Sequence, residues 1–246
     1  MKYKTAIITG ASEGIGCSFA KLLVKNGWEV IGISRNIRKL NSLNKELSKC
    51  KGVFKPFSCD VQNFKKLISI EKKINIPDLL FLNAGIYTPI DASNKNLEHF
   101  KHHINVNYLG VINAYEAFLP KMLKANKGHI IIMSSISAWV GLPKAAAYGP
   151  TKAALRSFAQ SIRYDLNSKG IKVQVCSPGF VETSATSINN FYMPGLLKAD
   201  EAAKRIYKNM HTKKFEFSFP LGFSTFMKLL SILPDKLSSF LINQIK

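Results

Sequence analysis

The sequence is poor in acidic residues, with 15 Asp and Glu against 35 Lys and Arg and a formal net charge of +20. The basic residues are nevertheless scattered along the chain, without a long basic run, a zinc-finger spacing or an RNA-binding signature. This pattern argues against a dedicated nucleic-acid groove. We therefore expect a solvated basic surface with no specific nucleic-acid partner, and at most weak, salt-sensitive binding to nucleic acid.

Cysteine is scarce as well, and the four present are Cys17, Cys50, Cys59 and Cys176, none of them in a C-x-x-C pair. Their spacing indicates neither a disulfide framework nor a metal site, so free thiols in a reducing cytoplasm are the simplest interpretation. No stretch reaches the roughly 18 apolar residues of a membrane span. No apolar signal-peptide core follows the first lysines. We expect a cytoplasmic protein without a bound metal.

The chain opens with a strand, a glycine-rich turn, a helix and a second strand. Residues 3–9 form a β-branched run, a helical pattern follows Gly14, and residues 28–34 form the next apolar run. This order predicts a βαβ unit with a parallel sheet. Gly10, Gly14 and Gly16 lie between strand and helix, where glycines let backbone N–H groups approach a pyrophosphate at the helix N-terminus. A plain tight turn is the alternative, and a dinucleotide site is the interpretation we favour.

The end of the second strand bears on which dinucleotide binds. An acidic residue there would bind the ribose hydroxyls of NAD. Here the position holds Ser34 and Arg35, and residues 30–45 contain no acid. A guanidinium can grip a 2′-phosphate with several donors. We therefore expect NADP(H) to be preferred over NAD(H), with Arg35 as its main contact, whereas Arg38 and Lys39 could equally be solvated helix positions.

Strand and helix patterns alternate through the rest of the chain and predict an α/β protein. The expected architecture is a doubly wound parallel β-sheet, a Rossmann fold, forming one domain over residues 1–220. Residues 221–246 form a short helical C-terminal extension rather than an independent domain. Further strands are expected at 53–59, 78–82, 129–134, 171–176 and 213–219, and helices at 36–49, 61–74, 96–125 and 148–168.

Polar and small residues follow several of these strands. Asp60 comes after the third predicted strand, where its carboxylate could accept from an adenine amino group, cap the next helix, or do both. Asn83, Ala84 and Gly85 follow the fourth, where small residues allow a cofactor backbone to lie close. The carboxyl edge of such a sheet is where open α/β proteins place their ligands.

Tyr148 and Lys152 are the candidate chemical groups, because positions i and i+4 of a helix share one face. A neighbouring ammonium favours the phenolate and makes tyrosine a better proton donor and acceptor. Ser135 stands thirteen residues before the tyrosine, at the end of a predicted strand. Asn107 lies inside a predicted apolar helix, as a functional amide or as a satisfied structural one. A lone Y-x-x-x-K pattern is weak, and ordinary helix-surface residues are its alternative.

Six motifs in order give the chain a resemblance to the short-chain dehydrogenase/reductase family, of the single-domain type, over about residues 3–183. They are T-G-A-S-E-G-I-G at 9–16, N-A-G at 83–85, N-x-x-G at 107–110, Ser135, Y-G-P-T-K at 148–152 and P-G-F-V-E-T at 178–183. Two departures are an acid at Glu13, where some NADP-using relatives carry a base, and the lack of the glycine-rich tail of tetrameric members. We expect a homodimer.

The resemblance implies roles for these residues. Tyr148 would be the general acid/base, Lys152 would lower its pKa and hold the nicotinamide ribose, Ser135 would orient the substrate oxygen, and Asn107 would support a water relay. Thr183 and the Val181 backbone would fix the nicotinamide carboxamide. The remaining expected cofactor contacts are Gly10, Ser12, Glu13, Gly14, Ile15, Gly16, Ser34, Arg35, Asp60, Val61, Asn83, Ala84, Gly85, Pro178 and Gly179, beside Tyr148 and Lys152 themselves.

The segment after the last motif is apolar and aromatic at 184–199, which indicates a hydrophobic or lipid-like substrate or simple loop packing. The extension carries two short amphipathic patterns, one before and one after Pro234. They could pack on the domain or on a dimer partner, or touch the anionic inner face of a membrane. The expected function is an NADP(H)-dependent oxidoreductase interconverting a small-molecule carbonyl and alcohol. The alternative is a non-catalytic NADP(H)-binding sensor or scaffold on the same fold.

Overall fold

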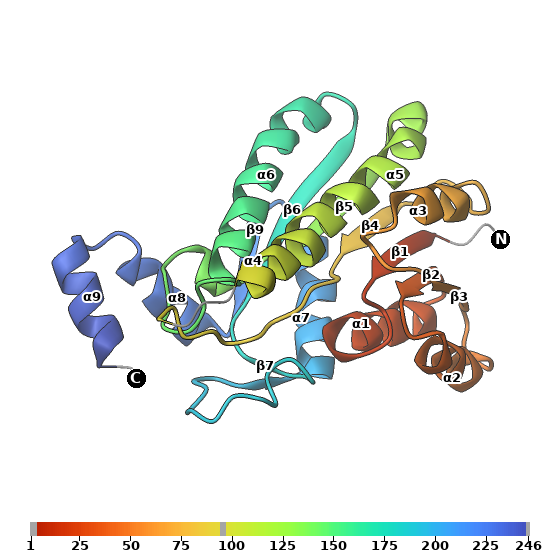
Figure 1. The fold of residues 1–246 in the computed structure, drawn as a ribbon. Coiled ribbons are helices and arrows are strands. Elements are labelled where there is room, and N and C mark those ends of the chain that lie inside the picture. The colour runs from red at the N-terminus through yellow and green to blue at the C-terminus, as the bar shows by residue number, and fades with distance from the viewer. Residues whose placement is uncertain (1–3, 94–96, 245–246) are drawn as a thin grey trace.

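A computed structural model of the chain describes residues 4–93 and 97–244 (Figure 1). Its centre is a seven-stranded parallel sheet with the order β3-β2-β1-β4-β5-β6-β9, in which the chain reverses direction along the sheet after β3. This is the predicted doubly wound Rossmann fold. The strands are β1 (Thr5–Thr9), β2 (Glu29–Ser34), β3 (Val53–Ser58), β4 (Leu79–Leu82), β5 (Gly128–Met133), β6 (Ile171–Pro178) and β9 (Glu216–Phe219).

Helices cover both faces of the sheet, and each face has its own apolar core (Figure 1). α1 (Gly14–Lys25), α2 (Ile37–Leu47) and α7 (Ala199–Met210) pack on one face. α3 (Phe64–Glu71), α5 (Gly110–Ala125) and α6 (Gly149–Asn167) pack on the other. Strands buried on both faces need apolar residues at every position, which explains why β1 and β4 are wholly buried and read as continuous apolar runs.

The element boundaries differ from the predicted ones at a few places. The helix expected over 61–74 begins at Phe64, because the side chain of Asn63 caps it by accepting from Lys66 N. Asp60 is therefore not the N-cap, and its carboxylate instead accepts from Gln62 N at 2.9 Å. α7 and a small two-stranded sheet, β7 (Val181–Glu182) with β8 (Leu197–Lys198), were not predicted.

The long helix expected over 96–125 is interrupted near its middle. It consists of α4 (Leu97–His103), a π-helical turn η1 (Ile104–Leu109) and α5. Residue 96 lies outside the described residues, as does Tyr3 of the first predicted strand. The π-helical turn contains Asn107, so the backbone deviates from α-helical geometry where a polar side chain stands inside the element.

The C-terminal extension folds into α8 (Leu221–Leu230) and α9 (Asp235–Asn243), at the end of the molecule opposite the N-terminus (Figure 1). One face of α8 packs on the short 3₁₀ turn η2 (Ile136–Ala138), where Ile136, Met227 and Leu230 form a third buried cluster. The predicted packing of the extension on the domain is thus present for one face. Residues 245–246 lie outside the described part. Among the described helices, none combines the length and apolar character needed to cross a bilayer.

Candidate functional site

One cleft of about 810 Å³ runs along the carboxyl edge of the sheet, from the glycine-rich loop to the C-terminal helices. Gly16 and Asn107 are buried and do not line it. All other predicted site residues do: Gly10, Ser12, Glu13, Gly14, Ile15, Ser34, Arg35, Asp60, Val61, Asn83, Ala84, Gly85, Ser135, Tyr148, Lys152, Pro178, Gly179, Val181 and Thr183. The structure therefore brings together residues that the sequence spreads over more than two thirds of the chain.

The loop between β1 and α1 is packed so tightly that only glycine fits at two positions. A Cβ on Gly16 would lie 2.3 Å from the Gly10 carbonyl oxygen, and Gly10 itself has a φ of 70°. At the start of α1, Glu13 makes no side-chain capping bond and the first turn holds no acid. The positive end of α1 therefore faces the cleft with backbone N–H groups that suit a phosphate.

We predict that Gly16→Ala weakens dinucleotide binding by about tenfold or more, because the added methyl must displace backbone rather than a flexible side chain. A fluorescence titration with NADPH measures the affinity, and a thermal melt checks the fold. Gly141→Ala is the matched control, since a Cβ there meets no atom within 4 Å. Equal NADPH affinity in both variants would contradict the prediction.

The end of β2 presents one guanidinium beside an acid that is already paired. Lys39 Nζ forms an ion pair with Glu13, and this bond lowers the pKa of the Glu13 carboxyl. Glu13 also accepts from Ser184 Oγ at 3.0 Å. Within residues 4–93 and 97–244, no carboxylate pairs with Arg35, which lines the cleft. The acid in the glycine loop is thus neutralised by Lys39, while the Arg35 guanidinium stays available for an anion.

Asn83 connects the end of β4 to the glycine-rich loop. Its Nδ2 donates to the Thr9 and Gly10 carbonyl oxygens at 3.1 and 3.3 Å. On another side of the glycine-rich loop, Gly14 lies against Thr183, because a Cβ on Gly14 would be 2.9 Å from Thr183 Cγ2. The ends of β1, β4 and β7 therefore meet around the loop, and the Asn83 amide holds its backbone in position.

Tyr148 and Lys152 share one space, as their spacing predicts. Tyr148 directly precedes α6 and is half-buried, and its carbonyl accepts from Lys152 N at 3.2 Å. The Lys152 ammonium lies 5.5 Å from the centroid of the Tyr148 ring and donates to the Met133 carbonyl at 3.0 Å. Ser135 is buried beside them at the end of β5. Hydroxyl, phenol and ammonium thus converge at one end of the cleft.

The predicted lowering of the Tyr148 pKa by Lys152 is wrong for this structure. Burial raises the pKa of Tyr148 to about 12, and a hydrogen bond with Ser135 opposes the rise only in part. Burial also lowers the pKa of Lys152 to about 8. The Lys152 ammonium lies over the ring and donates a hydrogen bond to the Met133 carbonyl. Tyr148 is therefore a neutral phenol, and a proton donor, near neutral pH.

Asn107 joins the loop after β4 to the first turn of α6. Its Oδ1 accepts from Ile86 N at 2.7 Å, and its Nδ2 donates to Ile86 O at 2.9 Å and to Thr151 Oγ1 at 3.2 Å. A Cβ on Gly85 would lie 3.3 Å from Asn107 Oδ1 and 3.4 Å from Lys152 Nζ. The buried amide is fully engaged in this way, and it lies next to the lysine.

Several cleft residues were not predicted. Tyr87 lies edge to face with Tyr148 at a centroid distance of 5.1 Å, two positions after the N-A-G turn. Phe180 contacts Phe191 and Phe223, each at 5.7 Å between centroids. Phe180 stands inside the P-G-F-V-E-T motif, which was the available signal. These rings make the end of the cleft beyond Tyr148 an apolar chamber between the loop at 184–196 and α8.

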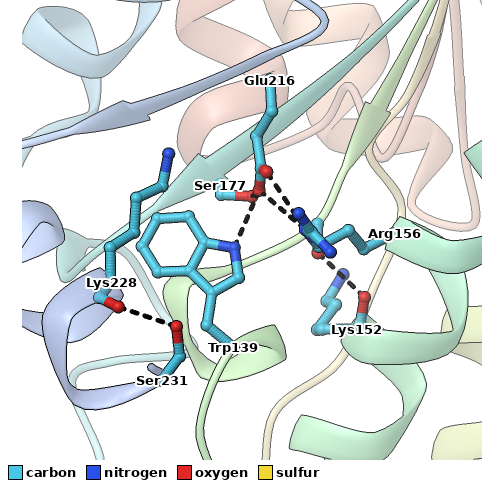
Figure 2. A network of polar contacts seen from close by, with 8 residues as sticks. Trp139, Lys152, Arg156, Ser177, Glu216, Lys228 and Ser231 are labelled. Atoms are coloured by element: carbon cyan, nitrogen blue, oxygen red, sulfur yellow. Dashed lines mark hydrogen bonds and ion pairs between the residues drawn. The ribbon is translucent and has the colours of Figure 1, made fainter. Parts of the chain in front are cut away.

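A buried carboxylate, also unpredicted, ties three of the site's elements together (Figure 2). Glu216 on β9 accepts from Trp139 Nε1 at 2.9 Å, Ser177 Oγ at 2.8 Å and Arg156 Nε at 3.0 Å. Trp139 follows Ser135 by four residues, and Arg156 follows Lys152 by one helical turn. Ser177 precedes the Pro178-Gly179 turn. Glu216 thereby holds the segments that carry the serine, the lysine and this turn.

Comparison with known proteins supports the family expectation. The family model described as short chain dehydrogenase matches residues 4–191. An uncharacterized oxidoreductase of Myxococcus xanthus is 31% identical over 241 residues, covering 96% of this chain and 95% of the relative. A serine 3-dehydrogenase of Agrobacterium fabrum is 31% identical over 215 residues, covering 82% and 86%. A short chain dehydrogenase from Burkholderia cenocepacia, solved in complex with NADP, shares the fold with a TM-score of 0.86, 23% identity and 98% coverage of both chains.

Proposed function

This chain belongs to the short chain dehydrogenase family, an oxidoreductase family, and we propose that it is an NADP(H)-dependent enzyme that interconverts a carbonyl and an alcohol. One observation carries the proposal: Tyr148, Ser135 and Lys152 meet at one end of a cleft whose other end holds the glycine-rich loop and Arg35. A cleft of this extent suits a dinucleotide with a small-molecule substrate beyond it.

The cleft residues fit a dinucleotide phosphate. The N-terminus of α1 and the backbone at Gly10 and Gly14 would hold the pyrophosphate, and Arg35 the 2′-phosphate. Val181 and Thr183 would hold the nicotinamide end next to Tyr148. When bound, the reduced cofactor supplies the hydride, and the protein supplies its orientation.

The side chains at the far end would handle the proton. Tyr148 donates its phenolic proton to the carbonyl oxygen, because an alkoxide is a much stronger base than a phenolate, even for a phenol whose pKa is about 12. Ser135 orients the substrate oxygen. Lys152, with a pKa of about 8, can hold or release a proton near neutral pH, beside the Asn107 amide.

Arg35 leads to a prediction on cofactor choice. Arg35→Ser should weaken NADPH binding about 10- to 150-fold, since a hydrogen bond to a charged group contributes about 1.5–3 kcal/mol, and should leave NADH binding unchanged. Titrations with both cofactors measure this. Arg38→Ser is the matched control, because Arg38 does not line the cleft. Equal losses for NADPH and NADH, or an equal loss in the Arg38 variant, would refute the assignment of Arg35.

The apolar chamber supports a hydrophobic or lipid-like substrate. The relative from Agrobacterium fabrum is named for serine as its substrate, and serine is instead a small zwitterion. An NADPH-oxidation screen over acyl thioesters, long-chain ketones, steroids, sugars, quinones and the aldehyde product of serine oxidation separates these classes. Tight NADPH binding without turnover on any of them would favour the alternative, a sensor or scaffold on the same fold.

The assembly is part of the same proposal. We infer that the chain forms a homodimer and that the enzyme is cytoplasmic. We also infer one domain over residues 1–220, to which residues 221–246 are appended as an extension. Light scattering on the purified chain measures the mass in solution, and a monomer at micromolar concentration would be the contradicting result.

A further inference from the structure

The helix α8 carries apolar residues on two opposite faces. Phe223, Met227 and Leu230 pack inward against the η2 turn. On the other face Leu221 is 74% exposed, and Leu229 is 53% exposed. Lys228 is the one charged residue among the ten of this helix. A water-facing helix surface ordinarily carries polar side chains, so the outer face of α8 calls for a covering partner.

Exposed apolar side chains also follow α8 in the chain. Ile232 in the following turn is 77% exposed, and Phe240 on α9 is 59% exposed. We call the set the apolar rim; its members are Leu221, Phe226, Leu229, Ile232, Leu237 and Phe240. Six large apolar side chains are thus exposed within twenty residues of the chain. Exposed apolar residues on protein surfaces ordinarily occur singly.

The apolar rim borders the mouth of the chamber. The loop at 184–196 touches the start of α8, because a Cβ on Gly195 would lie 2.5 Å from Pro220 Cγ. That loop is apolar and exposed too, with Tyr192 at 85% and Ile188 at 52%. Tyr192 from the loop and Phe223 and Ile242 from the two helices line the same cleft. The opening of the chamber thus lies among exposed apolar side chains on both sides.

Charge selects the partner of this surface. The chain has a net charge of +20, and between Leu221 and Phe240 the exposed Lys228 and Lys236 stand against a single acid, Asp235. A second copy of the chain would bring the same positive charge to the contact, whereas an anionic lipid surface attracts it. Apolar side chains flanked by lysines also fit the boundary between headgroups and acyl chains.

We propose that the apolar rim docks onto an anionic lipid bilayer, with the mouth of the chamber turned toward the membrane. An apolar carbonyl compound dissolved in the bilayer then reaches Tyr148 through the gap between the loop at 184–196 and α8. The docking stands independently of the reaction. The route of the substrate rests on the proposed function.

Vesicle flotation of the full chain tests the docking. Large vesicles of phosphatidylcholine with about one third phosphatidylglycerol should retain the protein, and phosphatidylcholine alone should retain much less of it. Leu229→Glu combined with Ile232→Glu should weaken binding to the anionic vesicles by about tenfold or more, because it removes two apolar anchors and adds repelled charges. Tyr164→Glu is the control, because it adds one negative charge at an exposed aromatic residue of α6, outside the apolar rim. This variant should bind to the anionic vesicles as the wild type does.

The variants are checked by a thermal melt and an NADPH titration, which should match the wild type because neither Leu229 nor Ile232 lines the cleft. Two vesicle results overturn the proposal: no retention of the wild type on anionic vesicles, or equal retention of the wild type and the double variant. The third contradicting result is a wild-type dimer that the double substitution dissociates while neither protein binds to vesicles. Since binding is measured without turnover, a failed flotation and a failed NADPH-oxidation screen give separate answers.

Discussion

Tyr148→Phe should lower kcat by about 10²- to 10⁴-fold and leave the NADPH affinity nearly unchanged, since a positioned general acid contributes a factor of that size. The substitution removes only the phenolic oxygen at the end of the cleft. The ring keeps its edge-to-face contact with Tyr87 and its place beneath the Lys152 ammonium. Steady-state kinetics on whichever carbonyl the screen identifies measures kcat, and a fluorescence titration measures the NADPH affinity.

Tyr164→Phe is the matched control for this change, because Tyr164 lies on the exposed side of α6 and does not line the cleft. We expect kcat in that variant to stay within about twofold of the wild type. Turnover in Tyr148→Phe at the wild-type rate would refute the assignment of Tyr148 as the proton donor. A loss of NADPH binding alongside turnover would instead show that the change disturbed the site.

Glu216→Ala should destabilise the protein by about 1–3 kcal/mol, the usual cost of leaving buried hydrogen-bond donors without their acceptor. The change leaves Arg156, Trp139 and Ser177 without their common acceptor. The Glu216 side chain is 9% exposed, so water replaces it poorly. At about 2–4 °C per kcal/mol for a chain of this size, the melting temperature should fall by about 5 °C.

Two controls make the Glu216 prediction specific. Glu216→Gln keeps an acceptor oxygen and should lose clearly less stability than the alanine variant. Glu46→Ala removes the acid of the Lys21–Glu46 ion pair. The Glu46 side chain is 52% exposed, so this change should alter the free energy of unfolding by less than about 1 kcal/mol. Equal melting temperatures for Glu216→Ala and Glu46→Ala would contradict the role of the buried network.

The elements that could be predicted are those whose signal is local. The apolar runs of β1 and β4 reflect burial on both faces of a parallel sheet, and the glycine turn before α1 marks a βαβ unit. α7 was missed although its residues are amphipathic, because it follows a loop without a clear strand signal. Of the alternatives for Asp60, the helix cap is wrong, because Asn63, three residues further on, is an equally good capping residue and caps the helix.

The candidate site divides in the same way. Tyr148, Lys152 and Ser135 were found because ordered motifs resembling one family support a four-residue spacing that is weak alone, and the structure brings all three to the cleft. Tyr87 follows the N-A-G motif without a signal of its own, and Phe180 was overlooked although it stands inside the P-G-F-V-E-T motif. No periodicity could have pointed to Glu216, whose partners Trp139 and Arg156 lie 77 and 60 positions away.

The sequence by itself determined the fold class, the family and most of the predicted site residues that line the cleft, because glycine turns, strand runs, i,i+4 pairs and ordered motifs are all visible along the chain. Only the tertiary structure decided the direction of the Tyr148 pKa, since desolvation by the surrounding elements outweighs the hydrogen bond with Ser135. It also decided which face of α8 is covered and which is left to a partner. Burial depends on what the rest of the chain places alongside each residue.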